Sequence, residues 1–322
     1  MTSTPRRAGA LLLCACVLLL AGCAAVQPRA GGASAQQTVL EVKPGVYLLR
    51  GSGGAPDADN LGRTGNAGFI VGPTGVVAID TGTSYRHGVA LLDAIRRVTD
   101  RPVRLALITH TRQEFLFGAT AFRERGIPLH MHLKAAQLMA SRCEGCLKTL
   151  RQTVGEDEMR GTAMFKPDAT VEASQRIELI GRPLQLLYFG HSSGPGDIAV
   201  LDVESGVLFA GGLLDAAHIP DVIDARLDGW QRALTELQGQ RITAIVPGHG
   251  PLASASLIGD VARYLTQLEA RLKTLLDAGT ALSDVPDAAA LPEFADWEQY
   301  ATIHRRNASV VFLRLEREQM LK

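Results

Sequence analysis

The chain has 322 residues, with 33 Lys and Arg against 33 Asp and Glu, so its formal net charge is zero. This balance excludes the strongly basic composition with which proteins neutralise nucleic-acid phosphates, and we expect no nucleic-acid partner. The length is sufficient for one large hydrophobic core or two smaller ones.

The first residues have the pattern of an export signal. Arg6 and Arg7 precede the apolar run "GALLLCACVLLLAG", which is too short to span a bilayer comfortably. The run ends in Leu-Ala-Gly-Cys at residues 20–23, which closely resembles a bacterial lipobox. We therefore predict a signal peptide over residues 1–22 and lipidation of Cys23. A plain secretion signal with a chance cysteine is the alternative.

Residues 23–38 are small and polar, as in a flexible tether. A lipidated Cys23 would anchor this tether to a membrane, and the predicted location is the periplasmic face of that membrane in a bacterium. The outer membrane is favoured, because Ala24 takes the place of the Asp that signals inner-membrane retention in enteric bacteria.

Two cysteines remain outside the signal segment and the lipobox. Cys143 and Cys146 form the sequence "CEGC", and two thiolates cannot complete a four-cysteine zinc site. The strand-to-helix context of a thioredoxin-like motif is missing, which weakens a redox function. For an exported chain we predict a disulfide in a small loop, with two free buried thiols as the alternative.

Strands and helices alternate along the first half of the chain. Residues 46–51 predict a strand and residues 68–82 a hairpin around Gly-Pro-Thr-Gly. Apolar residues at helical spacing predict a helix over residues 85–100. A strand buried on both faces, a helix and a further strand follow, at residues 103–110, 118–126 and 127–132. This order favours a parallel or mixed sheet with right-handed crossovers.

The second half continues with strand pairs and ends in helices. A charged helical stretch is predicted at residues 134–161, followed by two strand pairs with Gly turns at residues 171–190 and 197–212. A helix at residues 228–237 and a last strand at residues 242–251 complete the main domain. A helical stripe from Val261 to Leu275 predicts a core-facing helix, and a second helix is expected from Asp296 to the end. We divide the chain into a main domain, 39–252, and a helical segment packed on it, 253–322.

Four short motifs follow one another along the main domain. They are "AIDTG", "THTRQEF", "FAGGLL" and "PGHG", beginning at residues 78, 109, 209 and 247. In order and spacing they resemble the motifs of metallo-β-lactamase-fold hydrolases. The stretch "DWEQYATIHRRNASVVFLRLE" resembles the periplasmic subgroup called quinoprotein relay system zinc metallohydrolases. The resemblance implies an αββα sandwich of two mixed sheets with a C-terminal helical extension. It also implies a link to a periplasmic quinoprotein system.

In that family two metal ions a few ångströms apart activate water and polarise the bond to be broken. The family motif T-H-x-H-x-D-H is only partly kept. His110 and His249 match the first and last histidines, and Glu114 stands at the position of the Asp. The ligand positions that are replaced hold Arg112, Phe115 and Gly212.

One further ligand position depends on the alignment. Without gaps before Gly196-Asp197 it falls on Ser193, whereas His191 lies two residues earlier. We favour the gapless alignment because it keeps the length of the loop, and His191 then has no ligand role. The metal candidates are therefore His110, His249 and Glu114, together with His191 in the other alignment. The expected cofactor is none or one zinc ion.

These replacements favour a non-catalytic or weakly active homologue over an enzyme. The alternative is an active mononuclear zinc hydrolase of ester, thioester or amide bonds, with Glu114 and Asp80 as candidate catalytic groups. Arg112 is expected to fill the space of the metals and to pair with Glu114 or Asp80, leaving capacity for a small anionic ligand. Asp215 and His218 are considered as replacement ligands, but such residues near a turn are more often on the surface.

Overall fold

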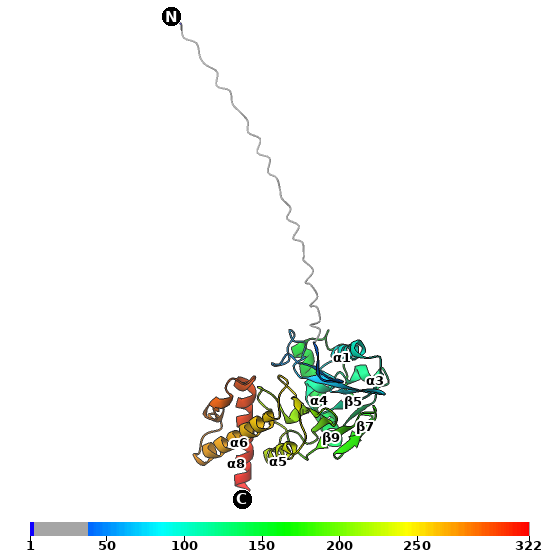
Figure 1. Ribbon diagram of the computed structural model, residues 1–322. Coiled ribbons are helices and arrows are strands. Elements are labelled where there is room, and N and C mark those ends of the chain that lie inside the picture. The colour runs from blue at the N-terminus through cyan, green and yellow to red at the C-terminus, as the bar shows by residue number, and fades with distance from the viewer. Residues whose placement is uncertain (3–37, 322) are drawn as a thin grey trace. The chain divides into compact units, whose positions relative to one another are not determined.

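The computed structural model describes residues 1–2 and 38–321, and the chain divides into two units, Met1–Gln36 and Gln37–Lys322. The predicted cleavage site and Cys23 lie outside the described residues. The strands and helices labelled in Figure 1 belong to the second unit. Within the described residues, no helix combines the length and the apolar composition needed to cross a bilayer.

The first sheet has seven strands in the order of the chain. It is antiparallel from β1 to β4 and parallel from β4 to β7. The strands are β1 Val39–Lys43, β2 Val46–Leu49, β3 Ala67–Gly72, β4 Gly75–Ile79, β5 Val103–Ile108, β6 Leu129–His132 and β7 Ala169–Val171. The predicted hairpin and the buried strand after it are thus confirmed as β3, β4 and β5.

The second sheet has five strands in the order β12-β11-β10-β9-β8. The β11–β12 pair is parallel and the other pairs are antiparallel, so this sheet is also mixed. The strands are β8 Gln175–Ile177, β9 Leu184–Tyr188, β10 Ile198–Asp202, β11 Val207–Phe209 and β12 Ala244–Val246.

Successive side chains along the strands point alternately to the core between the two sheets and to a core under the outer helices. The two sheets therefore lie between two layers of helices. On β4, Val77 joins the core between the sheets, whereas Val76 and Ala78 face the helices. On β10, Val200 points inward and Leu201 points outward. This is the two-residue period of a strand that is buried on both faces. The predicted αββα sandwich of two mixed sheets is confirmed (Figure 1).

The helices on the two outer faces come from different parts of the chain. The first sheet is covered by α1 Tyr85–Val98, α3 Ala119–Arg123 and α4 Leu133–Val154. The second is covered by α5 Leu227–Gln238, α6 Ser256–Asp277 and α8 Arg305–Met320. The predicted stripe of α6 is buried in this second core.

The C-terminal segment differs in one respect from its prediction. The expected helix from Asp296 begins only at Arg305, after a short 3₁₀ turn, Pro292–Phe294, and a π-helical turn, Tyr300–His304. His304 is buried there and contacts the hydroxyl of Tyr264 on α6 through Nδ1, at 3.1 Å. The remaining short helix, α7 Val285–Ala288, packs against α8.

Candidate functional site

The loops that follow β4, β5, β11 and β12 meet at one edge of the sandwich. Asp80 follows β4, His110 follows β5 and His249 follows β12. The neighbouring strands β4 and β5 are parallel, as are β11 and β12, so their carboxyl ends lie on the same side. The helix α2 Gln113–Leu116 begins directly after Arg112 and carries Glu114 at this edge.

Asp80 supports the loop that carries His110. Its carboxylate accepts hydrogen bonds from the backbone N–H of Thr109, at 2.8 Å, and from the Thr109 hydroxyl. The same hydroxyl oxygen lies 2.7 Å from Nδ1 of His110. Burial raises the pKa of Asp80 to about 7, in spite of the Thr109 hydrogen bonds that favour the carboxylate. Asp80 therefore acts on His110 through Thr109 rather than as a group facing a ligand.

His110 is buried and neutral. Burial, reinforced by the positive charge of Arg112, lowers its pKa to about 3. When the Thr109 hydroxyl donates to Asp80, Nδ1 of His110 must carry a proton and donate to Thr109. Nε2 then holds a free lone pair, and it has no hydrogen-bond partner within the described residues. One ligand atom of the family set is thus still in a form that can bind a metal.

The ring of Phe115 contacts both of the retained histidines. Its ring centroid lies 4.3 Å from that of His110 and 5.2 Å from that of His249. The side chain is 1% exposed, and a β-carbon on Gly65 would meet the ring at 2.4 Å. A buried apolar ring therefore packs against both imidazoles that contribute to the metal centre in the family.

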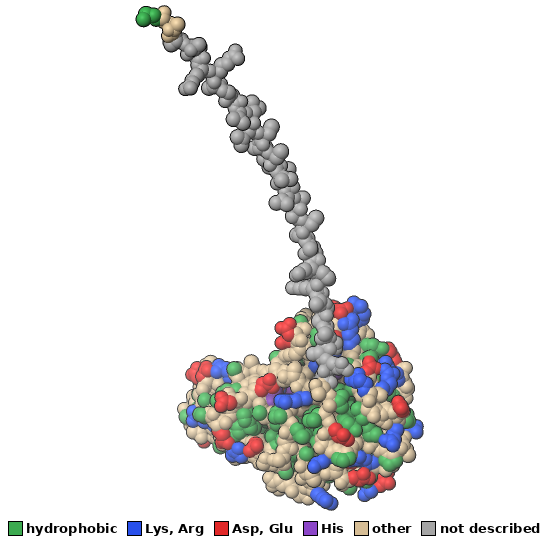
Figure 2. Space-filling model, turned by 45° about the horizontal axis from the view of Figure 1, so that its top comes forward, with side chains coloured by type: hydrophobic (Ala, Val, Ile, Leu, Met, Phe, Trp, Pro, Cys, Tyr) green, Lys and Arg blue, Asp and Glu red, His purple; other side chains and the backbone are tan. Residues whose placement is uncertain are grey.

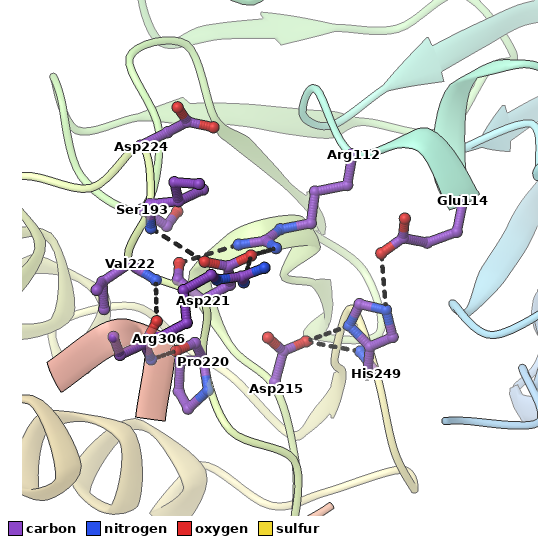
Figure 3. Close-up of polar contacts among 12 residues, drawn as sticks. Arg112, Glu114, Ser193, Asp215, Pro220, Asp221, Val222, Asp224, His249 and Arg306 are labelled. Atoms are coloured by element: carbon purple, nitrogen blue, oxygen red, sulfur yellow. Dashed lines mark hydrogen bonds and ion pairs between the residues drawn. The ribbon is translucent and has the colours of Figure 1, made fainter. Parts of the chain in front are cut away.

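Arg112 does not form the predicted ion pair with Glu114 or Asp80. Its Nη1 lies 2.6 Å from Oδ2 of Asp221, and Nη2 donates to the Asp221 carbonyl at 2.9 Å. Arg306, from α8, reaches the same Oδ2 at 2.5 Å. Burial opposes ionisation of Asp221, but the two guanidinium groups outweigh it and hold its pKa at about 2. The buried carboxylate of Asp221 decides where Arg112 points (Figure 3).

Glu114 pairs with His249 instead. Its Oε1 lies 3.1 Å from Nε2 of His249, and Nδ1 of the same ring lies 2.9 Å from Oδ1 of Asp215. Burial disfavours a charged imidazole, but the attraction of Asp215 and Glu114 outweighs it and raises the pKa of His249 to about 10. His249 is therefore a protonated group between two carboxylates, with both nitrogens occupied (Figure 3).

Two replaced ligand positions are filled by neighbouring groups. The Ser193 hydroxyl donates to Oδ2 of Asp197 at 2.7 Å. A β-carbon on Gly212 would lie 2.7 Å from the same oxygen and 3.0 Å from Cδ2 of His110. There is no free volume for a larger side chain at residue 212.

His191 does not belong to this site. Its Nε2 lies 2.6 Å from the carbonyl oxygen of Asp224, and its side chain lines a different cavity, together with Arg226 and Arg314. This geometry does not support the ligand role that only the alternative alignment gives to His191.

Asp215 and His218 lie at the centre of the site rather than on the surface. Both are buried, and His218 stacks on His249 with ring centroids 4.5 Å apart. Asp215, His218 and His249 form the one group of three or more His, Cys, Asp or Glu within the described residues that could hold a metal ion. Their ligand atoms lie within 4.8 Å of one another.

The residues present do not fit the two-metal centre of the family. The apolar ring of Phe115 packs against His110 and His249 where the family has a ligand, and His249 already binds a carboxylate through each nitrogen. The group Asp215, His218 and His249 could hold one metal ion only after a rearrangement. The rings of His218 and His249 are stacked with 13° between their planes, and lone pairs that lie in nearly parallel planes cannot converge on one ion. One of the two rings would have to turn.

The predicted disulfide is not formed in this structure. Cys143 and Cys146 are free thiols with their Sγ atoms 3.2 Å apart, compared with about 2.05 Å in a disulfide. They lie on α4 rather than in a small loop. The charged helical pattern of residues 134–161 correctly predicted this helix, but the loop interpretation of the CxxC motif was wrong.

A cavity of about 580 Å³ opens beside these groups. It is lined by side chains of the motif, of α4, of the loop 215–224 and of the C-terminal segment, including Arg112, Glu114, Cys146, His249 and Arg306. Its volume is typical of a small-molecule site. The C-terminal segment therefore forms part of the cavity wall. On the face shown in Figure 2, acidic and basic side chains are mixed across the surface.

Comparisons with known proteins agree with this architecture. A metallo-beta-lactamase type 2 from Bacillus sp. (strain 170) is 21% identical over 189 residues, which are 57% of this chain and 66% of that protein. The chain thus matches slightly less than two thirds of the length of this relative.

Solved structures show the same fold. A metallo-beta-lactamase from Pontibacter korlensis superposes with a TM-score of 0.59 at 21% identity, covering 71% of this chain and 98% of the other. The metallo-beta-lactamase FIM-1 from Pseudomonas aeruginosa, in its mono-zinc form, gives 0.58 at 18% identity, covering 73% and 98%.

The model of the Metallo-beta-lactamase superfamily matches residues 61–249, which is more than half of the chain. Proteins with this fold usually bind zinc, and the group Asp215, His218 and His249 is a candidate for it here. The chain belongs to the metallo-beta-lactamase superfamily.

Proposed function

We propose that this chain is an exported, lipid-anchored binding protein that keeps the cavity of a metallo-hydrolase and has lost its two-metal chemistry. The observation that carries the proposal is the packing of the Phe115 ring against both His110 and His249, at a position where the family has a metal ligand. Arg112 adds a permanent positive charge at a ligand position, and a guanidinium repels a dication. The retained scaffold supplies the cavity, and fold alone does not supply activity.

The ligand that we propose is small and carries a carboxylate. One wall of the cavity holds the guanidinium groups of Arg112, Arg142 and Arg306. They pair with only two carboxylates, those of Asp221 and Asp224, so this wall has one positive charge in excess. Across the cavity, Glu114 and Asp215 flank the protonated His249 and leave one negative charge in excess (2 − 1). An anionic group should therefore bind at the arginine side. We further propose the periplasmic face of a membrane as the location, with Cys23 as the anchor and a quinoprotein system as the partner.

The test combines zinc analysis, activity and binding on the purified full-length protein. We expect well below one zinc per chain, and hydrolysis of a β-lactam, a thioester and a phosphodiester at the background rate. In a thermal-shift screen of small mono- and dicarboxylates we expect stabilisation, which should weaken in Arg306→Ala. Stoichiometric zinc together with zinc-dependent hydrolysis would overturn the proposal.

A mononuclear zinc hydrolase is the second candidate. It is favoured by the group Asp215, His218 and His249 on the cavity wall, and by Nδ1 of His218, which is buried and has no partner within the described residues. Three protein ligands with an open position are the usual set of a catalytic zinc, which acts as a Lewis acid. His218→Ala would remove any zinc bound in this way, whereas zinc held by His110 would survive it.

A further inference from the structure

The two thiols of α4 differ in their access to the cavity. Cys143 is fully buried, whereas Cys146 is half-buried and lines the cavity beside Glu114 and Arg142. Their sulfur atoms are 3.2 Å apart, which is close enough for an S–H···S contact. A reagent in the cavity can therefore reach one sulfur directly and the other only through the first.

The local environment makes Cys146 the more nucleophilic of the two. Hydrogen bonding from Cys143, together with the positive charge of Arg142, outweighs burial and lowers the pKa of the Cys146 thiol to about 7. The same contact and burial raise the pKa of Cys143. Because the thiolate is the reactive form, Cys146 is suited to attack and Cys143 to follow.

The position on the helix indicates that a disulfide here would be easily reversed. Residues three apart on a helix have β-carbons about 5–6 Å apart. A disulfide needs a separation of about 3.5–4.5 Å. Closing the bond therefore bends α4, and a strained disulfide is more easily reduced. Gly145 lies between the two cysteines with open space at its β-carbon position, so the helix can bend here without a steric clash.

We propose that Cys146 and Cys143 form a thiol–disulfide exchange site for a small disulfide that enters the cavity. The Cys146 thiolate attacks one sulfur of the disulfide RSSR, which forms a mixed disulfide and expels RS⁻, and this takes up a proton. Cys143 then loses its proton and attacks the sulfur of Cys146, which expels the second thiol. In total two protein thiols and RSSR give one protein disulfide and two RSH, so the ligand is reduced and the protein is oxidised. This site does not depend on the proposed carboxylate binding.

The experiment uses the full chain in detergent, with Cys14, Cys16 and Cys23 replaced by Ser so that Cys143 and Cys146 are its two remaining thiols. This parent is reduced and freed of reductant, and 2-hydroxyethyl disulfide is the probe. We expect the parent to release two thiols per chain and to lose the mass of two hydrogen atoms, with dithiothreitol reversing the change. Cys143→Ala should release one thiol and keep the mixed disulfide. Cys146→Ser should react more slowly than Cys143→Ala by roughly tenfold or more. Circular dichroism and alkylation after denaturation check that each variant is folded and has its expected thiol content.

Gly145→Ala is the matched control for the geometry. Its added methyl group meets nothing within 4 Å, so it should stiffen α4 without a clash. In a redox buffer of oxidised and reduced glutathione, we expect its dithiol form to be more populated than that of the parent. Equal reactivity of the two single-cysteine variants would overturn the proposal, as would a mixed disulfide that persists in the parent. The zinc, hydrolysis and carboxylate-binding results would be unaffected by either outcome.

Discussion

Arg112 and Asp221 are 109 residues apart in the sequence and form a largely buried ion pair at the site, with Nη1 of Arg112 2.6 Å from Oδ2 of Asp221. This contact joins the motif after β5 to the loop in front of α5. Arg306 binds the same carboxylate oxygen of Asp221, so the C-terminal segment is joined to these two segments as well. Three segments are therefore fixed to one another at the edge where the family holds its metals.

We expect Arg112→Ala to lower the free energy of unfolding by about 2 kcal/mol, because it removes one partner of a largely buried pair. A double-mutant cycle with Asp221→Asn should give a coupling energy of about 1 kcal/mol or more. Arg96→Ala is the control, since the Arg96–Asp93 pair is exposed on α1 and should change stability by less than about 0.5 kcal/mol. Urea unfolding measures all four variants, and equal losses for Arg112→Ala and Arg96→Ala would contradict the buried pair.

The protonated His249 predicts a pH dependence of stability. Its pKa rises from the ordinary 6.5 to about 10 in the folded protein, so its stabilisation is fully present below about pH 6.5 and is lost as pH rises toward 10. The pKa values of Glu114 and Asp215 are lowered because His249 outweighs the effect of their burial, so their contribution is lost as pH falls below their ordinary range. The stability difference between the parent and His249→Gln should therefore shrink between about pH 6.5 and about pH 10. Urea unfolding across this range measures it, and a constant difference would show that His249 is not charged.

The fold was largely predictable because most of its strands and helices have strong local sequence patterns. Residues 105–108 form a continuous apolar run that could only be buried, and the stripe on α6 has helical spacing. The elements that escaped prediction are short or weakly patterned. The strand Val39–Lys43 is mostly exposed, and Ala169–Val171 has only three residues. Their backbones are fixed by neighbouring strands rather than by their own side chains.

The site was only partly predictable, because its ion pairs join distant segments. The motifs correctly brought His110, Glu114 and His249 to one edge, but nothing near Arg112 in the sequence points to Asp221. A signal was nevertheless present in "DAAHIPDVID", where every third residue from Asp215 to Asp224 is Asp or His in an otherwise apolar stretch. An apolar segment with regularly spaced ionisable groups is typical of a wall that faces polar partners inside the protein.

Export and anchoring give a prediction outside the described residues. Cys23→Ser should block lipid attachment, because the thiol is the acceptor in a lipobox, and two or more acyl chains are needed for stable anchoring. We expect the parent in the membrane fraction and the variant as an unprocessed or soluble form. Membrane fractionation and intact mass measure this, with Cys16→Ser, inside the predicted signal, as the control. A variant that stays in the membrane with the mass of the parent would contradict lipidation.

Restoring the lost ligands tests whether Phe115 and Arg112 are what prevents metal binding. Phe115→His places an imidazole beside Glu114 and His249, which would make three ligands of one half-site. With Arg112 still present, the permanent positive charge should keep zinc out. We therefore expect Phe115→His to gain no zinc, and Arg112→His with Phe115→His to gain about one zinc per chain, measured by elemental analysis. Phe115→Leu, which supplies no ligand, is the control for the loss of the buried ring.

The last lost ligand of the family is the bridging carboxylate at the position of Gly212. Adding it as Gly212→Asp to the double variant Arg112→His with Phe115→His is not expected to create a second zinc site. A side chain at Gly212 would lie 2.7 Å from Oδ2 of Asp197, and two carboxylates would then compete for one buried space. Gly212→Asp should therefore lower the melting temperature of the double variant without adding a second zinc. Adding Asp197→Asn removes one of the two charges and should recover part of the loss. A second tightly bound zinc in the variant that keeps Asp197 would show that residue 212 has room for a ligand and that Phe115 and Arg112 alone exclude the metals.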